Sequence, residues 1–131
     1  MVNSTLVNLE FKAIPTFGIS SYRAAIDFYV NFLNFQIDWE HRFGPTEPVY
    51  MQISRNGLLL HLSENKRFSQ NTIAFIETRN LLEFHRELVA KSMTRNVPDL
   101  AQTKWQTLQL EIADPFGNVL RFNEALPNEK A

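Results

Sequence analysis

The two halves of this chain end in matching segments, and this internal repeat constrains the fold more than any other feature. Gly57-Leu58-Leu59-Leu60-His61-Leu62-Ser63-Glu64 closes the first half, and Gly117-Asn118-Val119-Leu120-Arg121-Phe122-Asn123-Glu124 closes the second. Glycine, leucine and glutamate coincide when the segments are aligned, and apolar residues alternate between them. Two copies indicate a duplicated supersecondary unit rather than a solenoid, which needs at least three repeats. The alignment places His61 and Arg121 at equivalent positions.

Length and composition restrict the class of protein. A chain of 131 residues with 44% hydrophobic residues is expected to form one domain over residues 1–131. A formal net charge of -1 and the lack of a basic cluster argue against a nucleic-acid partner. The sequence has no cysteine, which excludes disulfides and thiolate chemistry, and no apolar run long enough to span a bilayer. Without a signal-peptide pattern, we expect a cytoplasmic protein with no membrane partner.

Hydrophobic periodicity and turn residues predict the same element order in both halves. The first half has a strand over residues 10–17, a helix over 24–33, a strand over 35–41, and a hairpin of strands 49–53 and 58–63. Ser20 or Ser21 can cap the helix, and Asn34 can end it. The second half has a strand over 72–77, a helix capped by Asn80, a short strand over 93–97, a loop over 98–106, and a hairpin of strands 107–113 and 118–123. Each half is therefore predicted to be a βαβββ module, over about residues 10–64 and 71–124.

Several of these segments together resemble the vicinal oxygen chelate superfamily, which includes glyoxalases, bleomycin resistance proteins and dioxygenases. The resemblance rests on Ala24-Ala25-Ile26-Asp27-Phe28-Tyr29, on Leu33-Asn34-Phe35 and, most specifically, on the turn Asp114-Pro115-Phe116-Gly117-Asn118. The pattern is nearest to that of the bleomycin-resistance branch. The resemblance implies an α+β fold of two βαβββ modules that form a curled mixed sheet, with helices on the convex side and a ligand cavity on the concave side.

Period-two alternation then assigns residues to the cavity or to the helix-packed core. It assigns Ile73 and Phe75 to the core, and a polar set to the cavity: Tyr50, Gln52, His61, Thr72, Gln109, Glu111, Arg121 and Asn123. An alternative is that these polar residues form the solvated face of an antiparallel sheet.

The residues at the family's metal-ligand positions argue against a metal. Members that bind a metal take one ligand from the first strand and one from the last strand of each module, which points here to Ile14, His61, Thr72 and Arg121. His61 can coordinate, but Arg121 has no lone pair to offer and its charge repels a cation. We therefore predict no metal and no cofactor, with Arg121 replacing the charge of the metal and pairing with Glu111 or an acidic ligand group. The alternative is a residual metal site formed by His61 with His41 or Glu111.

Aromatic residues near the predicted loops suit stacking on a planar ligand. Trp105 resembles the position from which bleomycin resistance proteins offer an aromatic ring to the drug. The predicted ligand-binding residues are Trp39, His41, Tyr50, Gln52, His61, Trp105, Gln109, Glu111 and Arg121. Bleomycin is cationic, whereas this chain is near neutral with Arg42 and Arg121 beside the groove. A smaller or acidic aromatic ligand is therefore as plausible as bleomycin.

The function that follows is metal-independent binding of an antibiotic-like aromatic small molecule. The protein would act as a homodimer with grooves shared between subunits and would sequester its ligand, with no catalytic residues. A second hypothesis is a metal-dependent enzyme of the glyoxalase or dioxygenase kind, with His61 and Glu111 as ligands or general bases. A third is a ligand-free interaction module whose cavity is filled by its own side chains.

Overall fold

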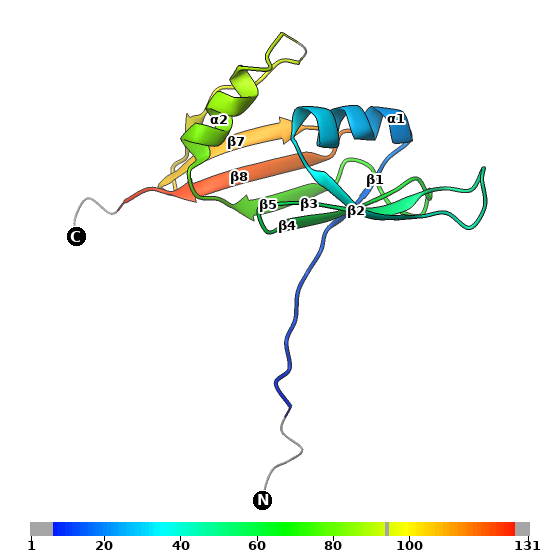
Figure 1. Ribbon diagram of the computed structural model, residues 1–131. Coiled ribbons are helices and arrows are strands. Elements are labelled where there is room, and N and C mark those ends of the chain that lie inside the picture. Colours follow the sequence, from blue (N-terminus) through cyan, green and yellow to red (C-terminus); the bar gives the residue numbers. More distant parts are fainter. Residues whose placement is uncertain (1–6, 94, 128–131) are drawn as a thin grey trace, which may run out of the picture.

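The computed structural model describes residues 7–93 and 95–127, which form two four-stranded mixed sheets with the helices on one side (Figure 1). The first module contains β1 (Thr16–Gly18), α1 (Tyr22–Ala25), the π-helix η1 (Ile26–Phe32), β2 (Gln36–His41), β3 (Tyr50–Arg55) and β4 (Leu58–Ser63). The second contains β5 (Ile73–Glu77), α2 (Leu81–Val89), β6 (Ala101–Gln102), β7 (Thr107–Ala113) and β8 (Val119–Ala125). The predicted α+β class and the duplicated βαβββ order are confirmed.

The strand orders are β1-β4-β3-β2 in what we call sheet A and β5-β8-β7-β6 in sheet B. In both sheets the first strand of the module pairs in parallel with the last, so the repeated segments become the inner strands β4 and β8. We call the side of each sheet away from the helices its open face. None of the helices in the described ranges has the length and apolar character needed to cross a bilayer.

Local sequence accounts for the first helix and its ends. Ser21 Oγ accepts a hydrogen bond from the Ala24 N–H at 3.1 Å, which caps the helix start. Phe28, Tyr29 and Phe32 are buried against the sheets. Asn34 ends the helix with a φ of 60°, the left-handed conformation expected of it.

The start of helix α2 in the second module differs from the prediction, in which Asn80 caps the helix. Asn80 adopts a left-handed conformation, with a φ of 61°, and its side chain makes no cap hydrogen bond. Instead the Glu124 carboxylate accepts from the N–H groups of Asn80 and Leu81, at 3.2 and 2.9 Å. A strand β8 side chain therefore satisfies the helix start, which sequence spacing does not reveal.

Two predicted strands differ from the structure. The strand predicted over residues 10–17 is confined to Thr16–Gly18. Thr16 pairs with His61 in parallel register and β4 begins at Leu58, so residues before about 13 lie beyond the end of the neighbouring strand. No strand lies in the described part of residues 93–97, while residue 94 is outside the described residues. The edge strand is β6, inside the segment predicted to be a loop, where it pairs with residues of β7.

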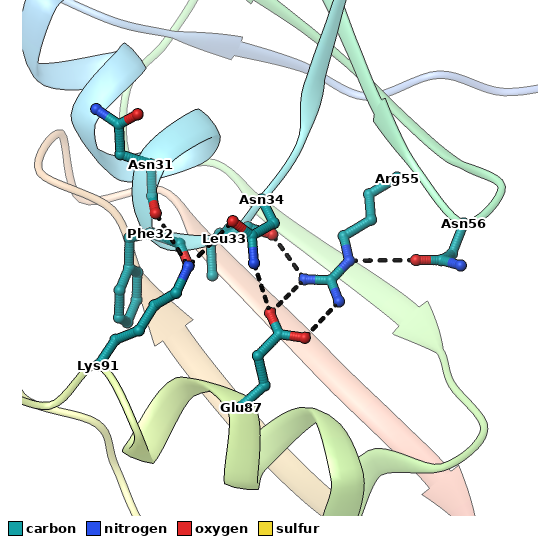
Figure 2. Close-up of polar contacts among 8 residues, drawn as sticks. All are labelled: Asn31, Phe32, Leu33, Asn34, Arg55, Asn56, Glu87 and Lys91. Atoms are coloured by element: carbon teal, nitrogen blue, oxygen red, sulfur yellow. Dashed lines mark hydrogen bonds and ion pairs between the residues drawn. The ribbon is translucent and has the colours of Figure 1, made fainter.

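Polar contacts at two places link the two modules. Tyr29 OH donates to Asp114 Oδ2 at 2.6 Å, which ties the first helix to the β7–β8 turn. In Figure 2, Arg55 at the β3–β4 hairpin holds the Glu87 carboxylate of α2 with two hydrogen bonds of 2.8 and 2.7 Å. Lys91 Nζ donates to the carbonyls of Asn31 and Phe32, at the end of the first helix.

Candidate functional site

A β-bulge in strand β2 brings Trp39 to the open face of sheet A. Ile37 pairs with Ile53, but Trp39 pairs with Gln52, so the register shifts at Asp38. Simple alternation from the buried Phe35 would place Trp39 on the core side. The extra residue in the bulge reverses this placement, because a bulge sets two residues of one strand against one of its partner.

The open face of sheet A carries three rings in contact. The rings of Trp39 and Tyr50 are parallel within 10°, with centroids 6.0 Å apart. His61 meets both edge-on, at 5.3 Å from Trp39 and 5.1 Å from Tyr50. We call these three residues together with Gln52 the sheet A cluster. It offers flat apolar surface next to polar groups, which suits a planar ligand.

A chain of hydrogen bonds orients the polar groups of this cluster. His61 Nδ1 lies 2.8 Å from Tyr50 OH, and His61 Nε2 lies 3.0 Å from Gln52 Oε1. Gln52 Nε2 donates to Asp38 Oδ2 at 2.9 Å, so its Oε1 faces the histidine and accepts from Nε2–H. His61 Nδ1 is then the acceptor for Tyr50 OH. Burial lowers the pKa of His61, which favours this neutral form.

A second set of polar side chains, Gln109, Glu111 and Arg121, lies on the open face of sheet B. We call these three residues the sheet B cluster. Arg121 Nε lies 2.9 Å from Glu111 Oε2, and Arg121 Nη2 donates to Gln109 Oε1 at 3.1 Å. The guanidinium carbon lies 5.7 Å from the centroid of the Phe75 ring. The predicted pairing of Arg121 with Glu111 is present, and Arg121 lies on the open face rather than in the core.

The side-chain assignment of β5 was reversed in the prediction. Ile73 and Phe75 are 61% and 55% exposed, whereas Ala74 is 7% exposed. Phe75 pairs with Arg121, so the two share a face, and Thr72 lies outside the strand. The prediction that Ile73 and Phe75 face the core is wrong because alternation shows only that two faces differ, not which one is covered.

Asn123 lies opposite Gln109 in the β7–β8 register, so it is on the face predicted for it. It is buried, and its Oδ1 accepts a hydrogen bond from Thr107 Oγ1 at 2.8 Å. This internal bond between β7 and β8 gives the side chain a structural role.

The residues at the metal-ligand positions of the fold do not fit a metal. In the strand register, His61 pairs with Thr16 of β1 and Arg121 pairs with Phe75 of β5, whereas Ile14 and Thr72 lie outside these strands. Phe75 has no donor atom, Arg121 is cationic, and both nitrogens of His61 already have hydrogen-bond partners. Within residues 7–93 and 95–127, no group of three or more His, Cys, Asp or Glu residues could hold a metal ion.

Of the remaining predicted residues, His41 lies directly opposite Tyr50 of the sheet A cluster in the β2–β3 register. His41 packs edge-on against Phe43, with centroids 4.5 Å apart, at the end of β2. Trp105 is exposed in the segment before β7. Sequence reasoning missed Asp38, which organises Gln52, and Phe75, which contacts Arg121. The alternation of apolar and polar residues from Phe35 to Glu40 is unbroken at Asp38, so the sequence carries no signal for the bulge.

The two clusters do not meet within one chain. Among the described residues, no hydrogen bond, ion pair or ring contact joins the sheet A cluster to the sheet B cluster. A cavity of about 900 Å³ lies elsewhere, between the β3–β4 hairpin and strand β5, and neither His61 nor Arg121 lines it. The two clusters are therefore separate surfaces, one on each open face.

The chain contains two βαβββ modules, and the open face of each sheet carries polar and aromatic residues. These features indicate the class of protein. A family model described as glyoxalase superfamily protein matches residues 2–129. The chain belongs to the glyoxalase superfamily, and the resemblance inferred from its motifs is confirmed. No curated protein is significantly similar to it in sequence.

Several solved structures share this fold. One is a bleomycin-binding protein from bleomycin-producing Streptomyces verticillus complexed with copper(II)-bleomycin, 22% identical with a TM-score of 0.66, covering 92% of this chain and 99% of that chain. Another is a bleomycin resistance determinant encoded on the transposon Tn5, 17% identical with a TM-score of 0.68, covering 88% and 98%. A third is a glyoxalase family protein from Enterococcus faecalis, 16% identical with a TM-score of 0.66, covering 88% and 97%. At these sequence identities, the similarity shows a shared fold and nothing more.

Proposed function

We propose that this protein binds a planar, aromatic small molecule without a metal and sequesters it without chemical change. The observation that carries the proposal is the sheet A cluster, where Trp39, Tyr50 and His61 form an accessible aromatic surface with oriented polar groups. Solved structures of similar fold include proteins described as binding bleomycin, which supports a ligand of the antibiotic kind. A cytoplasmic location belongs to the same proposal.

The groove is completed by a second copy of the chain in this proposal. The sheet A cluster supplies rings, and the sheet B cluster supplies Gln109, Glu111 and Arg121. Because both clusters lie on open faces and neither is covered within one chain, a homodimer can set the sheet A cluster of one subunit against the sheet B cluster of the other. Arg121 is already paired with Glu111, so the two charges compensate each other and the groove does not require a strongly charged ligand.

The test is calorimetric titration of metal-stripped protein with metal-free bleomycin and with a panel of planar aromatic acids. Replacing Trp39 by alanine removes a stacking surface, and we expect binding to weaken by about 1–3 kcal/mol, by analogy with base stacking on aromatic side chains. Trp105→Ala is expected to have an effect of the same size if its exposed ring faces the groove. Leu82→Ala, at an exposed position on α2, is the matched control and should bind as the wild type does. Equal affinity of the Trp39→Ala variant and the wild type would remove the sheet A cluster from the site.

The enzyme alternative is tested separately with Zn²⁺, Ni²⁺, Mn²⁺ and Fe²⁺. The donor set at Thr16, His61, Phe75 and Arg121 leads us to expect no tight stoichiometric binding. One tightly bound metal per subunit that is lost in His61→Ala would contradict metal independence and favour the enzyme hypothesis.

A further inference from the structure

Residues 64–72, which we call the linker, join β4 to β5 and fold back against strand β1. The Phe68 N–H donates to the Asn65 carbonyl at 3.0 Å, which turns the chain shortly after β4. The Gly18 N–H then donates to the Ser69 carbonyl at 2.9 Å, so the backbone of the linker is bonded to the end of β1. The linker is therefore a structured part of the surface beside sheet A.

Strand β1 permits this close approach because its last residue is glycine. A Cβ atom at Gly18 would overlap the carbonyl oxygen of Phe68 and would lie 2.8 Å from the carbonyl carbon and oxygen of Ser69. Any other residue would push the linker away from the strand. The Gly18 carbonyl also accepts from Asn118 Nδ2 of the β7–β8 turn at 2.9 Å. Gly18 thus fixes the linker relative to both sheet A and that turn.

The position of the linker brings the Phe68 ring to the sheet A cluster. The centroids of Phe68 and Tyr50 are 5.7 Å apart, and the two rings meet edge-on at an interplanar angle of 64°. Phe68 is half-buried, yet among the described residues it neither belongs to the hydrophobic core nor packs against it. Phe68 therefore adds a fourth ring to those of Trp39, Tyr50 and His61, and it comes from a segment outside the sheet.

Arg67 gives the linker a positive charge beside these rings. Its Cζ lies 5.0 Å from the centroid of the Phe68 ring, and its side chain is exposed. Among the residues that the structure describes, Arg67 forms no ion pair. Glu64, at the start of the linker, is already engaged, because it accepts from Arg42 Nη1 at 3.4 Å and from the Val49 N–H at 3.0 Å. The charge of Arg67 is therefore available to a ligand.

The acidic group of this face lies at the other end of the cluster. Asp38 accepts hydrogen bonds from three side chains, including Gln52 Nε2 at 2.9 Å. On β3, Gln52 contacts Asp38, whereas Tyr50 contacts Phe68. A planar ligand on these rings has a hydrogen-bonded carboxylate near one end and the guanidinium of Arg67 near the other. This arrangement favours an anionic group at the linker end.

We propose that the linker forms one wall of the binding surface on sheet A, and that its Arg67 selects planar aromatic ligands that carry a carboxylate. Phe68 contacts the aromatic part of the ligand, and the guanidinium offers its N–H donors to the two carboxylate oxygens. The selection rests on the proposed function, because it requires a ligand on the sheet A cluster. It narrows the class of ligand to aromatic acids.

Two probes of the same shape test the selection. Naphthoate and naphthamide differ in charge, and each is titrated into isotope-labelled protein while amide chemical shifts report the affinity and the location of binding. We expect the wild type to bind naphthoate about three- to tenfold more tightly than naphthamide, with the largest shifts around Tyr50 and Phe68. Binding of neither probe up to its solubility, or equal affinity for the two, would overturn the proposal.

Neighbouring substitutions separate the guanidinium from general surface charge. Lys66 and Arg67 are both exposed cations, and of these two residues only Arg67 contacts an aromatic ring. We expect Arg67→Gln to weaken naphthoate binding about three- to tenfold and to leave naphthamide binding nearly unchanged. Lys66→Gln should retain the preference for naphthoate. Equal effects of the two substitutions would contradict the role of Arg67.

Replacing Phe68 by alanine tests the wall itself. We expect both probes to lose affinity by the same factor, about two- to tenfold, and the amide spectrum to show an intact fold because Phe68 lies outside the core. Gly18→Ala should have the same effect by displacing the linker, and the double variant should bind no more weakly than either single variant. Wild-type affinity in Phe68→Ala would overturn the proposal. Wild-type affinity in Trp39→Ala would instead contradict the proposed function.

Discussion

At the residue scale, the neighbours of His61 determine which hydrogen bonds its ring nitrogens make. Gln52 and Tyr50 hold its two ring nitrogens, and Asp38 in the β2 bulge orients Gln52. The Asp38 carboxylate is exposed, and hydrogen bonds from Gln52 and then from Gln36 lower its pKa. The histidine of this cluster is thus a neutral hydrogen-bonding group and part of the aromatic surface.

The lowered pKa of His61 predicts a pH dependence of stability. Burial depresses its pKa in the folded state below its usual value of 6.5, so the unfolded chain binds this proton more readily. The contribution of neutral His61 is fully present above about pH 6.5 and is lost as the pH falls through the folded-state pKa. In urea titrations between about pH 7.5 and pH 5.5, the free energy of unfolding should decrease with acidity less steeply in His61→Gln than in the wild type. His41→Gln, which also removes one imidazole, is the control, and equal slopes in wild type and His61→Gln would refute this assignment.

At the scale of elements, the ion pair of Arg55 with Glu87 links the β3–β4 hairpin to α2 (Figure 2). Asn34 Nδ2 also donates to Glu87 Oε2 at 3.1 Å, and hydrogen bonds from Arg55 are the main reason that the pKa of Glu87 is lowered. Replacing Glu87 by glutamine leaves Arg55 with a weaker acceptor, and we expect a loss of about 1–3 kcal/mol in the free energy of unfolding at neutral pH. Glu83→Gln, at an exposed position on the same helix, should change it by less than about 0.5 kcal/mol. Similar values for the two variants in urea unfolding would show that the link contributes little.

At the scale of the whole molecule, a groove shared between subunits predicts complementation between two defective chains. Trp39→Ala damages the sheet A cluster, and Arg121→Ala damages the sheet B cluster, so each homodimer should bind the aromatic probe weakly. A mixed dimer contains one groove with both defects and one groove with neither. After random mixing, about a quarter of all grooves should recover wild-type affinity in fluorescence titrations. Absence of any recovery in dimers shown to have mixed would place the site within one chain.

The fold could be predicted from the sequence because its signals are local and occur twice. The matching segments Gly57–Glu64 and Gly117–Glu124 became the inner strands, and the Asn56-Gly57 and Asp114–Asn118 turns formed as their residue types require. Within the site, alternation correctly grouped Tyr50 with Gln52 and Gln109 with Glu111. The faces of Trp39 and Phe75 depended on a bulge and on strand register, which are set by pairing with distant residues.

The sequence by itself determined the class of fold, the two modules and the residues able to form the polar clusters, because hydrophobic period and turn chemistry act over a few neighbouring residues. Only the tertiary structure decided that the two clusters make no contact within one chain, which face of β5 is exposed, and that residues 7–12 lie beyond the end of the neighbouring strand β4. These outcomes depend on register and on the packing of one module against the other. Both are settled by contacts between residues far apart in the chain, and periodicity carries no information about them.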